Sequence, residues 1–401
     1  MKLYHVYCRL FQNVIRAGAY FLGWYRPELL KGKNSLMGLH RIITERKIHR
    51  VMIVTDQGIS SLGLMEEMLK SFERAGIEYF IYDKTVPNPT IENIEEVRKE
   101  YLEHQCEAII GFGGGSSIDC AKGLGARIAR PNKQIRQMKG LFKIRRKLPP
   151  LIAVPTTSGT GSEATVAAVI TDSRTHEKYP LEDIVLIPHF AVLDPVLTTG
   201  LPPHITSTTG MDALTHAVEA YIGRSNTRET IRLSRVAVRL IFDNIYEAYA
   251  NGKNLAAREN MQMASYYAGI AFTRAYVGNI HAVAHTLGGL YSIPHGLANA
   301  VILPYVLEYY GAPVYKKLAE LAEAAGIADD YATTEQKAKQ FIQAVKDMNR
   351  RMNIPEKLEG IKEKDIPVLV GRAYAEANPL YPVPVIFSKE DFKRIYDAIR
   401  E

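Results

Sequence analysis

Three of the chain's eleven histidines lie within fifteen residues. They are His281, His285 and His295, in the stretch GNIHAVAHTLGGLYSIPHG at residues 278–296. His281 and His285 are four residues apart, so on a helix they share one face. Pro294 indicates the start of a new element, and a turn before it can bring His295 back to that face. On this stretch alone two interpretations stay open: a metal site, or helix histidines bonded to backbone and water.

A second stretch supplies a carboxylate and a further imidazole. GMDALTHAVEAYI, residues 210–222, places Asp212 and His216 at positions i and i+4, on one face of one helix. Together with His281 and His295 they form three imidazoles and a carboxylate, a donor set that suits Fe(II) or Zn(II). The sequence therefore predicts a divalent metal site.

Two glycine-rich loops predict a dinucleotide site. GFGGGSSID (111–119) follows a strand pattern and precedes a helix, so its backbone can approach a diphosphate at the helix N-terminus. VPTTSGTGSE (154–163) is a second loop after a strand, and two such loops at neighbouring strand ends make a cleft. The spacing differs from GxGxxG, so a relative of the ordinary Rossmann domain is expected.

Asp56 ends the first expected strand, VMIVT. A carboxylate there can accept hydrogen bonds from ribose hydroxyls and would repel a 2′-phosphate, which favours NAD over NADP. A helix-capping role for Asp56 is the alternative, and the two roles can coexist.

The order of elements predicts two domains. Strand patterns at 51–55, 77–83, 107–112 and 151–155 alternate with helical stretches, one of them capped by Thr90, and AAVIT and AVLDP add strand candidates. This alternation of strands and helices predicts a parallel sheet. After 198–204 the spacing is helical, without a convincing strand, down to Glu401. We expect an N-terminal amphipathic helical extension (1–33), an α/β dinucleotide-binding domain (34–200) and an all-α metal-binding, catalytic domain (201–401).

Composition limits the classes of partner molecule and the cellular compartment that we expect for this chain. The chain has 401 residues with 47% hydrophobic and 23% charged residues, as in globular proteins. Its net charge of +7 is concentrated in residues 133–147, where no aromatic platform or nucleic-acid motif accompanies it, so no nucleic-acid partner is expected. Three cysteines without a CxxC spacing argue against disulfides and favour the cytoplasm.

The first 30 residues are apolar and contain the chain's single tryptophan. Arg9 and Arg16 interrupt them and no cleavage site follows, so neither a signal peptide nor a stable membrane span is expected. Val6, Leu10 and Val14 recur at helical spacing. We expect a helix packed on its own domain or on a sister subunit, with an interfacial membrane helix as the alternative. A homodimer or larger homo-oligomer is expected.

The motifs together resemble a known family. GGGSSIDCAK, PTTSGTGSE, GMDALTHAVEAY and HAVAHTLGGLYSIPHG, in this order and spacing, resemble the iron-dependent (group III) alcohol dehydrogenases, whose fold is similar to that of dehydroquinate synthase. The resemblance runs from about residue 35 to the C-terminus. It implies Asp212, His216, His281 and His295 as metal ligands and His285 as a proton relay beside them. It implies these cofactor contacts: Asp56, Asn88, Gly114, Gly115, Ser116, Asp119, Thr156, Thr157, Thr160, Ser162 and Lys178.

The implied activity is reversible hydride transfer between a primary alcohol or diol, or its aldehyde, and NAD(P). A bound cation, Fe(II) with Zn(II) as the other possibility, polarises the substrate oxygen. The alternatives are a polyol dehydrogenase or a metal-dependent lyase or cyclase on the same fold, and a non-catalytic nucleotide- or metal-binding protein.

Overall fold

The computed structural model describes residues 2–175 and 177–401 and divides into two compact units. One, the sheet unit, comprises Gly23–Leu201 and Lys253–Gln262. The other, the helical unit, comprises the N-terminal residues up to Leu22, Pro202–Gly252 and Met263–Glu401. The expected α/β and all-α regions are both present.

The sheet unit is built on six parallel strands. Their spatial order is β1 (Glu28–Lys31), β9 (Phe190–Leu193), β6 (Leu151–Pro155), β4 (Ala108–Gly113), β2 (Arg50–Val54) and β3 (Glu78–Tyr82). Every residue of β4 and β6 is buried, because helices cover both faces of a parallel sheet. The predicted parallel sheet is confirmed.

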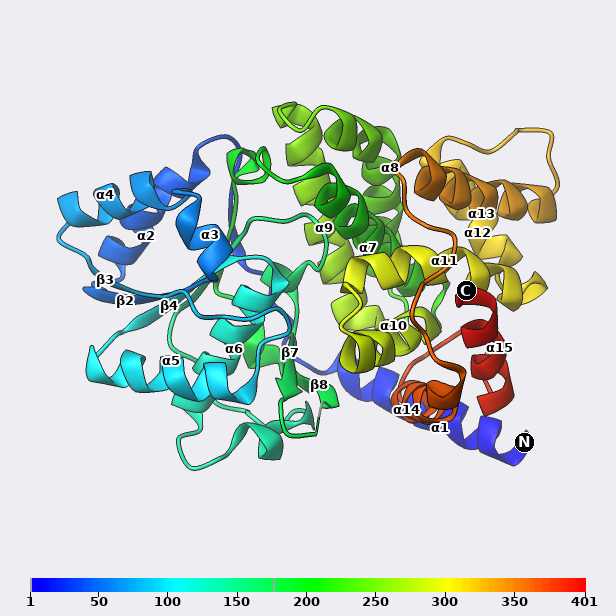
Figure 1. Cartoon of the computed structure of the whole chain (residues 1–401), viewed down its shortest axis with the longest axis horizontal. Coiled ribbons are helices and arrows are strands. Elements are labelled where there is room, and N and C mark those ends of the chain that lie inside the picture. The colour runs from blue at the N-terminus through cyan, green and yellow to red at the C-terminus, as the bar shows by residue number, and fades with distance from the viewer. Residues whose placement is uncertain (1, 176) are drawn as a thin grey trace. The chain divides into compact units, whose positions relative to one another are not determined.

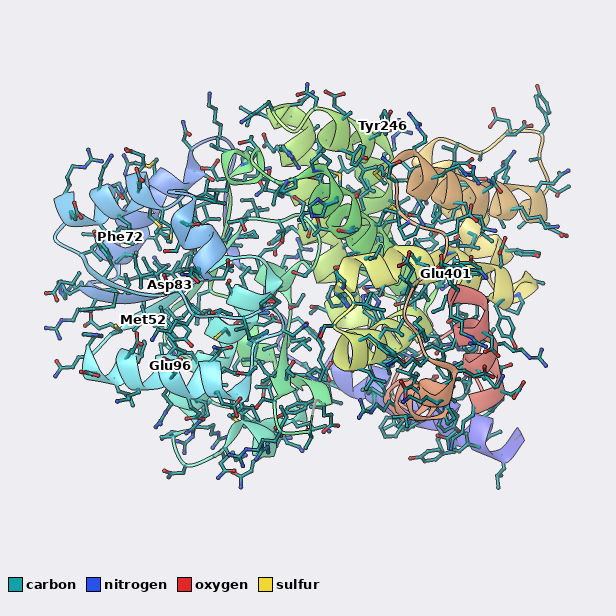
Figure 2. The ribbon with its side chains drawn as sticks, viewed as in Figure 1. Met52, Phe72, Asp83, Glu96, Tyr246 and Glu401 are labelled. Atoms are coloured by element: carbon teal, nitrogen blue, oxygen red, sulfur yellow. The ribbon has the colours of Figure 1, made fainter. Side chains whose placement is uncertain are left out.

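Helices cover the two faces of this sheet (Figure 1). Phe72 of α4 (Glu66–Arg74) packs with α2 (Leu39–Glu45) against Val51 and Ile53. Met52 faces the opposite way, toward α5 (Ile91–Glu103) and α6 (Gly115–Ala129). Figure 2 labels Met52, which faces the layer of α5 and α6, and Phe72, which lies in the layer of α2 and α4. The alternation along β2 places odd and even residues in different layers, and Thr90 caps α5 as predicted.

The sheet unit differs from the expectation in three places. AAVIT lies in a separate small sheet, where β7 (Ala167–Asp172) pairs antiparallel with β8 (Glu177–Glu182) beside β5 (Gly140–Leu141). Its alternating burial is typical of a strand with one covered face. The helical stretch expected between the strand patterns at 51–55 and 77–83 is two helices, α3 (Gln57–Ser61) and α4, separated at Gly63 with φ +68°. Strand β1 lies inside the predicted 1–33 extension and belongs to the sheet.

The helical unit carries no strand within residues 202–401. The N-terminal helix α1 (Lys2–Tyr20) groups with this unit, although the sheet unit follows it in the chain. The other long helices are α7 (Pro203–Ile222), α8 (Arg228–Ala250), α9 (Leu255–Ala275), α10 (Asn279–Tyr291), α11 (His295–Tyr310), α12 (Ala312–Ala325), α13 (Thr334–Arg351), α14 (Ile366–Ala377) and α15 (Lys389–Ile399). Among the described residues no helix has the length and apolar character needed to cross a membrane.

Candidate metal centre and cofactor loops

Helix α7 presents three polar side chains on one face. Asp212, His216 and Glu219 follow one another at spacings of four and three residues, so they share a stripe of the helix. All three are buried. Charged groups are rarely buried unless they are paired or coordinate a metal, so this stripe marks a site rather than an ordinary packing face.

Helices α10 and α11 bring His281 and His295 to that stripe. One ligand atom from each of Asp212, His216, His281 and His295 lies within 4.8 Å of all the others. Asp212 Oδ1 is 3.5 Å from His295 Nε2 and 3.9 Å from His281 Nε2. Tetrahedral ligands about 2.1 Å from a cation lie roughly 3.4 Å apart. The spacing and donor types therefore fit Fe(II) or Zn(II).

Glu219 fixes the ring of His281. Its carboxylate accepts a hydrogen bond from His281 Nδ1 at 2.6 Å and from the backbone N–H groups of Gly278 at 2.9 Å and Ile280 at 2.8 Å. With the proton on Nδ1, the lone pair of His281 is on Nε2, which faces Asp212. Glu219 thus joins the start of α10 to the candidate ligand and sets its orientation.

Asn299 lies one helical turn after His295 on α11, in the middle of the cluster. Its side-chain nitrogen is 2.6 Å from Asp212 Oδ1, 3.1 Å from His295 Nε2 and 3.2 Å from His281 Nε2. The side-chain NH₂ group has two hydrogens, so it can donate to two of these three atoms at a time, and the accepting lone pairs point toward it. The same lone pairs are what a cation requires.

His285 is oriented by a second carboxylate. Its Nδ1 lies 2.6 Å from Glu376 Oε1, and the Tyr381 hydroxyl donates to the same oxygen at 2.8 Å. The ring stacks on His295 with centroids 5.2 Å apart. His285 therefore stands beside the cluster, and Glu376 of α14 holds the proton on Nδ1 so that Nε2 can accept another.

The two glycine-rich loops contact each other. A Cβ atom on Gly115 would lie 2.7 Å from Thr160 Cγ2, and one on Gly114 would lie 3.7 Å from Thr157 Cγ2. Thr156 extends the contact, because its N–H donates to the Gly113 carbonyl at 3.0 Å. Glycine at 115 is thus required by the opposite loop, in addition to the ligand approach that the sequence suggested.

Three of the predicted cofactor residues meet at the start of α6. The Asn88 N–H donates to Ser116 Oγ at 3.2 Å, and Lys178 Nζ donates to Asn88 Oδ1 at 2.8 Å. Asn88 itself has φ +59°, the left-handed region that asparagine tolerates. These contacts gather a cation, an amide and a hydroxyl at a helix N-terminus, where a phosphate is favoured.

Asp56 adopts the capping role that the sequence left open. It is the N-cap of α3 and accepts from the Ile59 N–H at 3.0 Å, while the Ser117 hydroxyl donates to its other oxygen at 3.2 Å. The second bond places Asp56 beside the glycine-rich loop, since Gly113 and Ser117 adjoin it. A ribose contact stays a prediction, compatible with the cap.

Behind the loops lies a buried network of charged side chains. Asp119 accepts hydrogen bonds from Ser162 Oγ at 2.5 Å and from the Val169 N–H at 3.0 Å. Lys122 donates to the carbonyls of Thr165 at 2.9 Å and Ala167 at 2.8 Å. Burial raises the pKa of Asp119 and lowers the pKa of Lys122 to about 8. Burial also raises the pKa of Glu163, the next residue after Ser162, to about 7.

Replacing Lys122 by methionine should destabilise the sheet unit by about 3–5 kcal/mol, because the buried acids lose their cation and two carbonyls lose a donor. Chemical denaturation followed by circular dichroism measures the change. Lys70→Met removes an exposed lysine paired with Glu67 and should shift the free energy of unfolding by less than about 1 kcal/mol. Equal midpoints for the two variants would contradict the structural role of Lys122.

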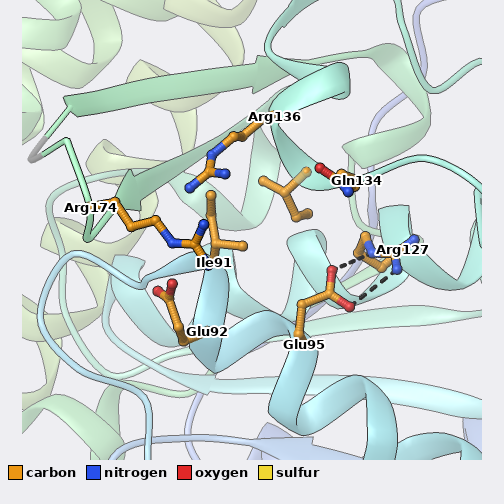
Figure 3. A pocket seen from close by; sticks show the side chains of 8 residues that line it. Ile91, Glu92, Glu95, Arg127, Gln134, Arg136 and Arg174 are labelled. Carbon is orange, nitrogen blue, oxygen red and sulfur yellow. Dashed lines mark hydrogen bonds and ion pairs between the residues drawn. The ribbon is translucent and has the colours of Figure 1, made fainter.

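A separate cavity of about 360 Å³ lies in the sheet unit (Figure 3). None of the predicted site residues lines it, and two of its three arginines are paired with acids. Arg127 bonds both oxygens of Glu95, at 2.5 and 3.1 Å, and Arg136 bonds both oxygens of Asp172, at 2.5 and 2.9 Å. These pairs occupy the side chains of Arg127 and Arg136. We assign the cavity no role.

Family models match most of the chain. The model of the iron-containing alcohol dehydrogenases matches residues 27–195, and that of the C-terminal region of the Fe-containing alcohol dehydrogenase family matches residues 206–400. A 1,3-propanediol dehydrogenase of Klebsiella pneumoniae is 39% identical over 82% of this chain and 86% of its own length. An NAD-dependent methanol dehydrogenase of Bacillus methanolicus is 36% identical over 88% and 94%. A solved 1,3-propanediol oxidoreductase superposes with a TM-score of 0.90 at 35% identity, covering 94% of this chain and 99% of that one.

Proposed function

Because the chain belongs to the iron-containing alcohol dehydrogenase family, we propose that it interconverts a small primary alcohol or diol and its aldehyde, with Fe(II) as resident metal and NAD as the favoured cofactor. The observation that carries this proposal is the convergence of Asp212, His216, His281 and His295 on one buried point. The named relatives act on 1,3-propanediol and methanol, which supports a short primary alcohol or diol as substrate class.

Four side chains would hold the metal. Asp212 contributes the negative charge, and the imidazoles of His216, His281 and His295 contribute neutral nitrogen. A divalent cation held there supplies a Lewis acid, which lowers the pKa of a substrate hydroxyl and polarises an aldehyde carbonyl. His285 would pass the released proton to solvent, since Glu376 holds its Nδ1 and leaves Nε2 as the accepting atom.

The sheet unit would hold the cofactor. Gly114, Gly115 and Ser116 would contact the diphosphate at the N-terminus of α6, with Asn88 and Lys178 nearby. The hydroxyl-rich loop would line the other side, through Thr156, Thr157, Thr160 and Ser162. We assign Asp119 a supporting role, because both of its oxygens accept hydrogen bonds from the loop and from β7.

Anaerobic reconstitution tests the proposal. The purified protein is stripped of metal, loaded with Fe(II) or Zn(II), and assayed with NAD and NADP against primary alcohols, diols and aldehydes. We expect Fe(II) and NAD to give the higher kcat/KM with a short alcohol or diol. Absence of alcohol or aldehyde turnover with every metal, although NAD binds, would favour a non-catalytic binding protein instead.

Replacing Asp56 by asparagine should shift the cofactor preference toward NADP. Asparagine keeps the cap of α3 and removes the charge that would repel a 2′-phosphate, a repulsion of about 1–3 kcal/mol at a partly exposed site. The ratio of kcat/KM for NADP to that for NAD should therefore rise about tenfold or more. Asp83→Asn, which removes another carboxylate that follows a strand, is the control. An unchanged ratio in Asp56→Asn would remove Asp56 from the specificity argument.

We also infer a homo-oligomer that works in the cytoplasm. Cys8, Cys106 and Cys120 are buried and form no disulfide with one another, which suits a reducing compartment. The exposed apolar side chains of α1 support the oligomer.

A further inference from the structure

Helix α1 turns two polar side chains, Arg9 and Gln12, toward its own unit. Arg9 donates to the carbonyls of Val383 at 2.6 Å and Pro384 at 2.9 Å, and Gln12 donates to those of Tyr381 at 2.8 Å and Pro379 at 3.1 Å. Tyr4 stacks on Tyr374 of α14, with ring centroids 5.9 Å apart, and α1 and α14 lie side by side (Figure 1). The helix is thus anchored by hydrogen bonds rather than by a large apolar contact.

The outward face of α1 is apolar. Leu3 is 85% exposed, Leu10 63%, Val14 62% and Tyr7 52%. With Ala17, these residues repeat at spacings of four and three, which is the seam that pairs two helices. A surface helix normally has the opposite orientation, with apolar residues inside. A contiguous exposed apolar stripe of this kind marks an interaction site.

The stripe lies outside the part of the chain that the family shares. The family model begins at residue 27, after α1 has ended at Tyr20. The solved relative covers 94% of this chain and 99% of its own. The common fold therefore does not account for the exposed face, and what covers it is a property of this chain.

We propose that α1 pairs antiparallel with α1 of a second copy of this chain, across a two-fold axis near position 12. The seam is complementary to itself about that position. Leu10 meets Val14 of the other copy, the large Tyr7 meets the small Ala17, and Leu3 meets the region of residue 21. A two-fold interface requires this property, because a residue i that contacts residue j of the other copy implies that residue j also contacts residue i of that copy. The proposal builds on the inferred homo-oligomer and is independent of the activity.

Charge and area agree with this arrangement. Arg16 is the one charged residue among the exposed positions between 3 and 18. In the antiparallel pair the two Arg16 positions are roughly 12 Å apart along the axis, beyond the screening length of about 8 Å, whereas a parallel pair would place them side by side. If each of about five seam side chains per copy loses on the order of 100 Å², the interface buries about 1,000 Å², the lower bound for a specific contact.

Light scattering after size-exclusion chromatography tests the proposal on the full chain at micromolar concentration. Leu10→Glu and Val14→Glu should each halve the measured mass, because a buried glutamate faces an apolar residue of the other copy. The double variant Leu10→Lys/Val14→Glu should restore it, because lysine then faces glutamate across the axis. A parallel pair would instead oppose like charges, so failure of rescue would overturn the antiparallel geometry.

Val368→Glu is the matched control. Val368 lies on α14 and is 50% exposed. The variant therefore adds a surface charge outside the seam, and its measured mass should equal that of the wild type. An oligomer that survives Leu10→Glu would overturn the α1 pairing while leaving the homo-oligomer intact, and a monomeric wild type would overturn both. Co-sedimentation with phosphatidylcholine–phosphatidylglycerol vesicles, lost in Leu10→Glu without a change of mass, would show that a lipid surface covers the stripe instead.

Discussion

Asp212→Ala should leave the protein unable to retain iron and lower kcat/KM with an alcohol by more than the roughly 10–100-fold that loss of an outer partner costs. Asp212 is the one anionic donor of the four, so its removal leaves neutral imidazoles to hold a divalent cation. Its Oδ1 also accepts from Asn299, so the variant frees the amide that lies between the histidines. Both effects weaken the binding of a cation at the same site.

Metal content after anaerobic Fe(II) loading and desalting is the direct measurement. Wild type should retain about one iron per chain, and Asp212→Ala and His216→Ala should each retain far less. Asp243→Ala serves as the control, because it removes an exposed carboxylate on α8 that bonds Arg239 at 2.6 Å, far from any candidate ligand in the sequence. Circular dichroism establishes that each variant folds. Stoichiometric iron and full activity in Asp212→Ala would exclude the proposed site.

The sequence predicted the two-part fold because each part has its own periodicity. Continuous apolar strands such as 107–112 and 151–155 have few alternatives to a buried parallel sheet. The small β7–β8 sheet was harder to place, since a strand with one covered face and a strand in a doubly covered sheet look similar over six residues. Strand β1 is four residues long and has no local signal that separates it from a loop.

The candidate ligands were predictable in pairs, and the cluster was not. Spacing of four residues shows that Asp212 and His216 share a face of α7. That α10 and α11 bring His281 and His295 to this face depends on contacts between helices far apart in the chain. The resemblance to the family predicted that the four residues form one site, which the spacing of residues alone could not predict.

The partners that orient the histidines escaped the sequence for different reasons. Glu219 lies three residues after His216 and was within reach of the same spacing argument. Asn299 lies four residues after His295 and carried the same signal. Glu376 is 91 residues from His285, and nothing local connects them. The apolar neighbours of the ligands, such as Ala213 and Ala282, are fully buried, so they pack the helices and give little information about a substrate pocket.

Glu219→Gln should lower the affinity for Fe(II) about 10–100-fold, the usual cost of removing a partner that orients a metal-binding histidine. The carboxylate accepts three hydrogen bonds, from His281 Nδ1 and from the N–H groups of Gly278 and Ile280. A glutamine at this position has one accepting oxygen, so its NH₂ group faces at least one of these donors. The imidazole then loses the bond that fixes its tautomer and its direction.

Two measurements separate orientation from simple destabilisation. The rate of Fe(II) loss to a chelator should rise in Glu219→Gln, and unfolding of the metal-free protein should change by only about 1–3 kcal/mol, the cost of one unsatisfied buried donor. Glu320→Gln is the matched control, because Glu320 accepts from the Tyr221 hydroxyl of the same helix α7 at 2.6 Å without touching a histidine. Its iron loss should match the wild type. If both variants lose iron at the same rate, Glu219 stabilises α7 and α10 without setting the direction of His281.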